Sequence, residues 1–196
     1  MGDHTERRES FHRDVPARLM IRVIDDVLTA DQCSSLIALI ERAGDVLRHQ
    51  HLPAKVDYIT VVSPETHRLV VAHGDDISAI MRTAPDGVRP QWGNVERRRD
   101  PAGMPFHFDN ADPYTAVASV TYLNDDYEGG ETIIRPAGEG SSRFDTVIRP
   151  RIGRTVFFNG VRSFHAVSPI VGTRYTLPLW CARMPADYPQ KLRWWL

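Results

Sequence analysis

The second half of the chain is a series of short segments rich in β-branched and aromatic residues, and this pattern limits the possible folds more than any other feature. Each segment is bounded by Gly, Pro, Asn or Asp. The segments cover residues 116–123, 131–135, 155–159 and 174–181, and Gly129-Gly130 is typical of a turn between two of them. Many short, regularly spaced strands favour a double-sheet barrel such as a jelly roll.

The first half of the chain carries helical signals instead. Thr29 is followed three residues later by Gln32, which forms a capping box, and apolar residues then recur at helical spacing. We therefore expect a helix over residues 30–43 and a second, shorter helix that starts at Asp75 or Asp76. Helices followed by strands indicate an α+β protein, so the sequence predicts a double-stranded β-helix supported by N-terminal helices.

The size of the chain is that of a single domain. Its 196 residues, 42% of them hydrophobic, are enough to bury a core without disulfide or metal support. Residues 1–18 are highly charged and are expected to form a flexible tail, which leaves residues 19–196 as one domain. Cys33 and Cys181 lie in apolar segments, which indicates reduced thiols in a core and a cytoplasmic location.

The charges of the chain nearly cancel, with 24 Lys and Arg against 25 Asp and Glu. A near-neutral protein has no global field that attracts nucleic acid or anionic lipid. No window approaches the roughly 20 apolar residues that a membrane span requires. We therefore expect neither nucleic acid nor a membrane as a partner, whereas the oligomeric state stays open. The apolar C-terminal residues Trp194-Trp195 are expected to fold back on the domain or to form an oligomer contact.

A His-x-Asp motif opens the β-rich half. His107 and Asp109 point to the same face of a strand, so both can reach one cation. His-x-Asp/Glu occurs four times in the chain, but two matches lie in the charged tail and one lies at the start of the second predicted helix. A three-residue metal site needs one more ligand, and the only histidine after Asp109 is His165.

Nine residues after His165 comes Arg174, and the intervening Ser168-Pro169 and Gly172 are typical of a turn. The turn would bring Arg174 back on an adjacent strand, near the metal. A guanidinium is planar and permanently charged, so it pairs with a carboxylate through two hydrogen bonds. Arg174 is therefore the candidate for binding the distal end of a dicarboxylate.

The order of these motifs along the chain resembles that of the prolyl hydroxylases in the Fe(II)- and 2-oxoglutarate-dependent oxygenase superfamily. The resemblance covers roughly residues 90–183. An Arg nine residues after the distal His is similar to the oxygen-sensing prolyl hydroxylases, whereas the collagen-type enzymes have Lys at ten. The resemblance rests on His107-x-Asp109, Tyr122-Leu123-Asn124, Gly129-Gly130, Gly153-x-x-Val156-x-Phe158, His165-x-Val167, Thr173-Arg174-Tyr175 and Trp180.

The resemblance implies an enzyme that binds Fe(II) through His107, Asp109 and His165, with 2-oxoglutarate as co-substrate and ascorbate as a possible reductant. The far carboxylate of 2-oxoglutarate would meet Arg174 and the hydroxyl of Tyr122. Trp180 either lines the floor of the pocket or packs in the core.

Residues 91–104 lead into the metal strand and are either a substrate-contacting loop or a solvated charge run. Trp92 and Arg97 in this stretch, and Arg162 before the distal His, are candidates for binding substrate. With few other loops available for recognition, we expect hydroxylation of a small molecule, such as an amino acid or a metabolite. The alternative within the family is a prolyl hydroxylase acting on a peptide or protein. The alternative from another class is a non-oxidative, cupin-like metal-binding module.

Overall fold

The computed structural model describes residues 21–43, 47–48, 56–63, 68–109, 115–135 and 145–183. The expected flexible tail, residues 1–18, and the C-terminal pair Trp194-Trp195 lie outside the described residues. Among the described residues, no helix has the length and apolar character that crossing a membrane requires.

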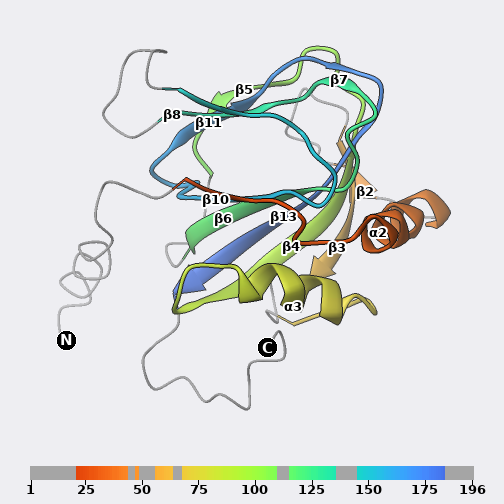
Figure 1. The fold of residues 1–196 in the computed structure, drawn as a ribbon, viewed down its shortest axis with the longest axis vertical. Coiled ribbons are helices and arrows are strands. Elements are labelled where there is room, and N and C mark those ends of the chain that lie inside the picture. Colours follow the sequence, from red (N-terminus) through yellow and green to blue (C-terminus); the bar gives the residue numbers. More distant parts are fainter. Residues whose placement is uncertain are drawn as a thin grey trace, which may run out of the picture.

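Two helices and many short strands make up the described part of the chain (Figure 1). The helices are α2 (Ala30–Arg42) and α3 (Gly74–Arg82). The strands are β1 (Arg22–Ile24), β2 (Leu47–Arg48), β3 (Val56–Val62), β4 (Val88–Arg98), β5 (Met104–His107), β6 (Thr115–Tyr122), β7 (Glu128–Gly129), β8 (Thr132–Arg135), β9 (Thr146–Ile148), β10 (Thr155–Phe158), β11 (Phe164–Val167), β12 (Ile170–Val171) and β13 (Arg174–Arg183).

The strands form two main antiparallel sheets that face each other (Figure 1). The larger sheet has seven strands in the order β1-β10-β6-β13-β4-β3-β2, and the smaller has four in the order β5-β11-β8-β9. In Figure 1, α3 lies below the larger sheet, on the side away from the smaller one, and α2 lies beside β3. This arrangement confirms the predicted double-stranded β-helix with helical support.

The first helix begins as the sequence predicts. The Gln32 amide donates to Thr29 Oγ1 at 3.2 Å and the Thr29 amide donates to Gln32 Oε1 at 2.9 Å, so both halves of the capping box are present. The second helix begins at Gly74, slightly before the predicted start, with His73 at the N-cap. His73 makes no side-chain cap there, and its Nδ1 lies 2.8 Å from Asp76 Oδ2 instead.

Strand β4 lies where the sequence did not predict a strand. Residues 91–98 are neither a substrate loop nor a solvated charge run, because they belong to an eleven-residue strand between β13 and β3. Pro90, Gly93 and the charged residues weaken the local β signal. Tertiary pairing overrides that weakness, because both neighbouring strands hydrogen-bond to β4, with a register shift of β13 opposite Pro90.

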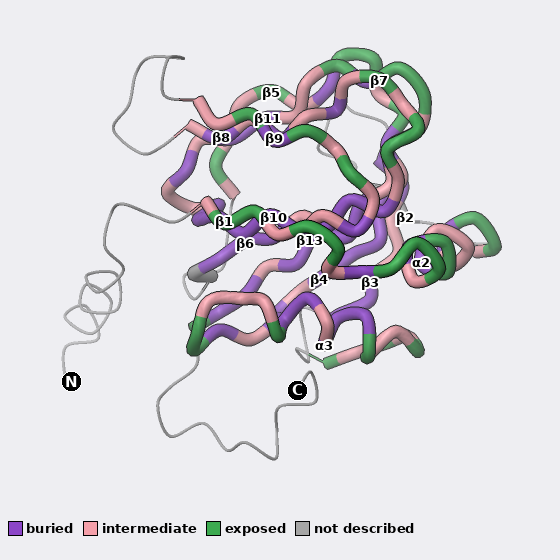
Figure 2. Tube along the Cα trace, in the orientation of Figure 1, coloured by how far each residue is buried: buried purple, intermediate pink, exposed green. Residues whose placement is uncertain are grey.

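The two faces of β4 and β13 have different neighbours. Val95, Leu177 and Leu179 are fully buried in the core that also contains the apolar residues of α2 and α3. The alternate side chains point to the opposite face, toward the smaller sheet. Figure 2 shows buried residues concentrated along β3, β4 and β13, between the helices and the second sheet. The apolar outer face therefore anchors the two strands whose inner face carries the site.

The two cysteines lie in the core, as the sequence predicts. Cys33 and Cys181 are both free and buried. Burial raises the pKa of the Cys33 thiol to about 11 and that of the Cys181 thiol to about 12. Both side chains are therefore protonated, unreactive core residues at neutral pH.

Candidate active site

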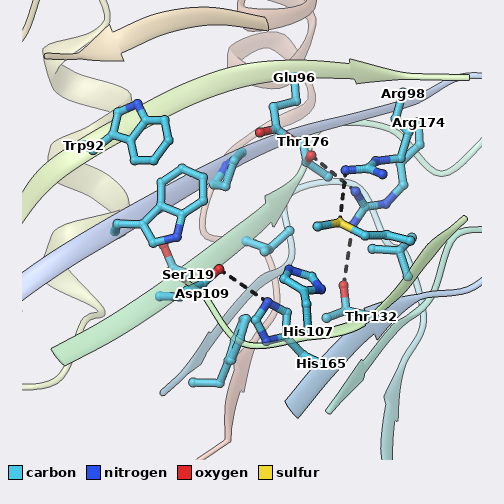
Figure 3. A pocket seen from close by; sticks show the side chains of 17 residues that line it. Trp92, Glu96, Arg98, His107, Asp109, Ser119, Thr132, His165, Arg174 and Thr176 are labelled. Atoms are coloured by element: carbon cyan, nitrogen blue, oxygen red, sulfur yellow. Dashed lines mark hydrogen bonds and ion pairs between the residues drawn. The ribbon is translucent and has the colours of Figure 1, made fainter. Parts of the chain in front are cut away.

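A cavity of about 130 Å³ lies between the two sheets (Figure 3). The larger sheet contributes side chains of β4, β6, β10 and β13, and the smaller sheet contributes those of β5, β8 and β11. The residues of the lining that carry polar or aromatic groups are Trp92, Glu96, Arg98, His107, Asp109, Ser119, Thr132, Phe158, His165, Arg174, Thr176 and Trp180.

Three potential metal ligands meet at one end of this cavity. His107 and His165 are direct partners in the β5–β11 ladder, with ring centroids 4.2 Å apart. Asp109 follows β5, and its amide donates to the carbonyl of Gly160 at 2.9 Å, beyond the end of β10. One ligand atom from each of the three residues lies within 4.8 Å of the others, and His165 Nε2 is 3.5 Å from Asp109 Oδ1. The structure therefore brings together Asp109 and the two histidines that the sequence selected from eight.

The hydrogen bonds around these side chains fit a metal ion. His107 Nδ1 lies 3.0 Å from the carbonyl of Pro105, and His165 Nδ1 lies 3.0 Å from that of Ser163. Donation to a carbonyl places the proton on Nδ1 and leaves each Nε2 with a free lone pair. Asp109 Oδ2 is buried and has no hydrogen-bond partner. A buried carboxylate oxygen without a partner is costly, and a cation would satisfy it.

The immediate surroundings of the three ligands keep them close together and favour the neutral form of His107. A side chain at Gly160 would place its Cβ 1.7 Å from Asp109 Oδ2, so only glycine leaves room for the carboxylate. Burial, reinforced by the neighbouring His165, lowers the pKa of His107. A neutral imidazole is the form that coordinates a metal.

Arg174, on β13 of the larger sheet, lines the same cavity away from the three ligands (Figure 3). It is 3% exposed, and its Nε donates to the carbonyl of Gly130 at 3.1 Å. Its two terminal nitrogens make long contacts of 3.4 Å with the hydroxyls of Thr176 and Thr132. Gly130 has a φ of +68°, as the predicted turn requires. Arg174 is thus held by its Nε while its terminal nitrogens face the cavity.

Tyr122 does not line the cavity, because Thr132 lies between its hydroxyl group and the cavity. Its hydroxyl donates to Thr132 Oγ1 at 2.6 Å, and Arg174 Cζ lies 5.2 Å from the centroid of its ring. The side chain is fully buried. The resemblance implied a direct contact of this hydroxyl with the co-substrate, whereas the structure connects Tyr122 to Arg174 through Thr132.

The two tryptophans are both in the cavity wall. Trp92 of β4 and Trp180 of β13 are direct cross-strand partners and stack with ring centroids 4.3 Å apart. Trp92 Nε1 donates to Asn94 Oδ1 at 3.1 Å, which fixes the orientation of its ring. Figure 3 shows Trp92 at the side of the cavity opposite Arg98 and Arg174, and Trp180 stacks on it.

Two of the candidate substrate residues lie elsewhere. Arg97 points to the outer face of β4, where it contacts Asp57 Oδ2 at 2.8 Å and Glu41 Oε1 at 2.9 Å. Successive residues of a strand face opposite sides, so Arg97 is excluded from the cavity by its register. Arg162 is partly buried, and it is not among the residues that line the cavity. Neither residue is placed to contact a ligand in the cavity.

Five polar residues of the lining are not among the site residues predicted from the sequence: Glu96, Arg98, Ser119, Thr132 and Thr176. The signal for two of them was present. Once residues 88–98 are recognised as a strand, Glu96 and Arg98 fall on the same face as Trp92, because they are four and six residues further on. Thr132 and Thr176 carry no signal of their own, since threonine is common in strands.

Comparison with known proteins agrees with this geometry. Residues 94–182 match the 2OG-Fe(II) oxygenase superfamily. A prolyl-4-hydroxylase from Pseudomonas putida is similar in structure, with a TM-score of 0.62 and 20% identity, covering 84% of this chain and 92% of that one. No curated protein matches the chain in sequence.

Two further structures show the same fold. One is a prolyl hydroxylase from Trichoplax adhaerens in complex with a peptide fragment of hypoxia inducible factor, with a TM-score of 0.63, 17% identity and coverage of 83% of both chains. The other is SnoN, an alpha-ketoglutarate-dependent epimerase from nogalamycin biosynthesis, with a TM-score of 0.60, 15% identity and coverage of 84% of this chain and 79% of that one.

Residues 94–182 therefore resemble a 2OG-Fe(II) oxygenase domain, and the protein is an enzyme with Fe(II) as cofactor and 2-oxoglutarate as co-substrate. Two histidines and one carboxylate are the donor set expected for such iron, and they leave further metal positions open. This identification favours the oxygenase over the cupin-like module as an explanation of the site.

Proposed function

We propose that this enzyme hydroxylates a C–H bond of a small molecule that carries an amine, such as an amino acid or a related metabolite. Succinate and carbon dioxide would be the co-products. The observation that carries this proposal is the position of Glu96, a carboxylate that is 9% exposed and lines the same cavity as the stacked tryptophans.

The three ligands and Arg174 would have separate tasks. His107, Asp109 and His165 would hold Fe(II) through one imidazole nitrogen each and one carboxylate oxygen. Arg174 would bind the far carboxylate of 2-oxoglutarate, because its buried terminal nitrogens face the cavity. When bound, Fe(II) and 2-oxoglutarate would activate dioxygen, the oxidant, so that one oxygen atom enters the C–H bond and the other enters succinate as 2-oxoglutarate loses carbon dioxide. The chain supplies orientation and a cavity that keeps water from the reacting atoms.

Glu96 supports an amine in the substrate. Figure 3 shows it on the same wall as Trp92 and Arg98, inside the cavity. An ammonium group gains a charge-assisted hydrogen bond from a carboxylate and is also attracted to the face of an indole ring. A prolyl residue within a polypeptide has an uncharged nitrogen, so it would gain neither a charge-assisted hydrogen bond from Glu96 nor a cation–π attraction to an indole ring.

The alternative substrate is a prolyl residue in a peptide or protein. Similar structures include a prolyl-4-hydroxylase and a prolyl hydroxylase bound to a peptide, and also an enzyme of nogalamycin biosynthesis. At 15–20% identity these likenesses show the fold alone. The lining of this chain's own cavity therefore carries the choice between the two substrate classes.

A direct test measures succinate release and a +16 mass product with free amino acids, other small amines and proline-containing peptides, side by side. We expect stimulation by a small amine, and Glu96→Gln should raise its KM about tenfold or more, the usual loss for one charge-assisted hydrogen bond. Glu128→Gln, an exposed position on β7, is the matched control. Hydroxylation of the peptides without stimulation by any small molecule would overturn the proposal.

A further inference from the structure

A second arginine lies beside Arg174 in the cavity wall. Arg98 of β4 is the direct cross-strand partner of Arg174 of β13, and its side chain is 4% exposed and lines the cavity. Its Nη2 lies 3.3 Å from the sulfur of Met104. Its Nε and Nη1 are buried and have no hydrogen-bond partner. Figure 3 shows the two guanidinium groups close to each other at the same end of the cavity.

This pair of arginines is unfavourable without a ligand. Like charges at directly opposed positions of a sheet are destabilising, and buried donors without partners add a desolvation cost. Burial and the charge of Arg174 both lower the pKa of Arg98, against the opposing effect of the Glu96 and Asp100 carboxylates. A thioether is only a weak acceptor for the one donor that has a contact. An anion between the two guanidinium groups would relieve both costs.

We propose that Arg98 is a second binding residue for 2-oxoglutarate and shares the far carboxylate of the co-substrate with Arg174. Side chains at opposed positions of an antiparallel pair start about 4.5–5.5 Å apart, so the terminal nitrogens of both arginines can reach the two oxygens of one carboxylate. The inference rests on the assignment of Arg174 made under the proposed function.

The structure also explains why a second group is needed at this position. The Tyr122 hydroxyl is buried against Thr132 at 2.6 Å and Tyr122 is not part of the lining. The Nε of Arg174 already donates a hydrogen bond to the carbonyl of Gly130. Two unpartnered nitrogens of Arg98 are therefore the strongest remaining donors at this end of the cavity.

A carboxylate could also come from the substrate, and the experiment separates the two sources. Binding is measured by calorimetry on Fe(II)-loaded protein without oxygen and without substrate, so that no turnover occurs. The ligands are 2-oxoglutarate and 2-oxopentanoate, which keeps the keto acid but lacks the far carboxylate. The variants are Arg98→Met, Arg174→Met and the double variant, and thermal unfolding confirms that each is folded.

We expect Arg98→Met to weaken 2-oxoglutarate binding by about tenfold to a hundredfold, as the loss of a hydrogen bond to a charged group does. Its affinity for 2-oxopentanoate should stay within about twofold of wild type. The double variant should lose less than the product of the two single losses, because both arginines would contact one carboxylate.

Unchanged 2-oxoglutarate affinity in Arg98→Met would overturn the inference, and a raised KM for substrate in that variant would then reassign Arg98 to a substrate carboxylate. The failure of the proposed function looks different. If Arg174→Met retained wild-type affinity for 2-oxoglutarate, the assignment of Arg174 to the far carboxylate of the co-substrate would be wrong, whatever the effect of Arg98→Met.

Discussion

The two faces of the β4–β13 strand pair differ in how their polar groups are satisfied. On the outer face, Arg97 contacts both Asp57 and Glu41 within 3 Å, and Leu179, further along the same face of the pair, is fully buried. On the inner face, Arg98 has two buried nitrogens without partners, and Arg174 has only long contacts to two hydroxyls from its terminal nitrogens. Two adjacent arginines of one strand thus have opposite environments.

This difference separates stability from function along a single strand. Alternation sends each successive side chain to the other face, so a strand can pack a core with one set of residues and present a ligand site with the other. Unpaired buried polar groups are costly and are found where a ligand will satisfy them. The closed outer face supplies the stability that offsets the strain of the inner one.

The largest expected effect comes from removing a metal ligand on the inner side. His165→Ala should abolish Fe(II) binding and 2-oxoglutarate turnover, because two protein ligands remain for a cation that needs three. Metal content and succinate release are the measurements. His73→Ala is the control, because His73 pairs with Asp76 on α3 and lies outside the cavity. Normal succinate release by the His165 variant would remove this residue from the site.

Arg174→Ala should weaken 2-oxoglutarate binding by about 2–5 kcal/mol, the usual loss when one partner of a buried charge pair is removed. Iron binding should persist, and Arg174→Lys should be intermediate because it keeps the charge but not the fork geometry. Calorimetry with both ligands measures the two effects. Arg97→Ala is the matched variant from the outer face, and a comparable loss of 2-oxoglutarate affinity there would contradict the contrast between the faces.

On the outer face, Leu179→Ala should lower the free energy of unfolding by about 2–5 kcal/mol, since the deletion leaves a cavity in a fully buried position. Denaturant unfolding measures this loss. Val171→Ala, which changes a side chain that is 66% exposed, should cost much less. Similar losses in the two variants would mean that the outer face is not the main source of stability.

The smallest expected effect concerns Glu41, whose side chain is 39% exposed. Hydrogen bonds from Tyr175 and from Arg97 lower the pKa of Glu41 below its ordinary value of 4.5. A lowered pKa in the folded state stabilises the protein above the unfolded pKa, and this contribution is lost as pH falls through the folded pKa. Glu41→Gln should therefore cost about 1 kcal/mol or less at neutral pH.

Unfolding curves of wild type and the Glu41 variant, taken from pH 7 down to pH 3, test this pH dependence. The difference between them should shrink below about pH 4.5, the ordinary value for a glutamate. A difference that grew on acidification would reverse the sign and exclude the Arg97 and Tyr175 contacts as its cause.

Much of the fold follows from local pattern. The capping box at Thr29 and the strands β6, β8, β10 and β13 were predictable because their signals lie within a few neighbouring residues. Strand β4 was not, because Pro90 and Gly93 disrupt the local pattern and only the pairing with β3 and β13 makes it a strand. Because β4 was not predicted, Glu96 and Arg98 were not placed on one face of a strand together with Trp92.

The sequence by itself determined the three metal-ligand candidates and Arg174, because their chemistry is carried by residue type, order and spacing. Only the tertiary structure decided which arginine faces the cavity. Arg97 and Arg98 are chemically identical neighbours, and the one that meets a ligand is chosen by the register of β4 against β13. Register depends on long-range pairing between strands about 80 residues apart, so it cannot be predicted from a local sequence pattern.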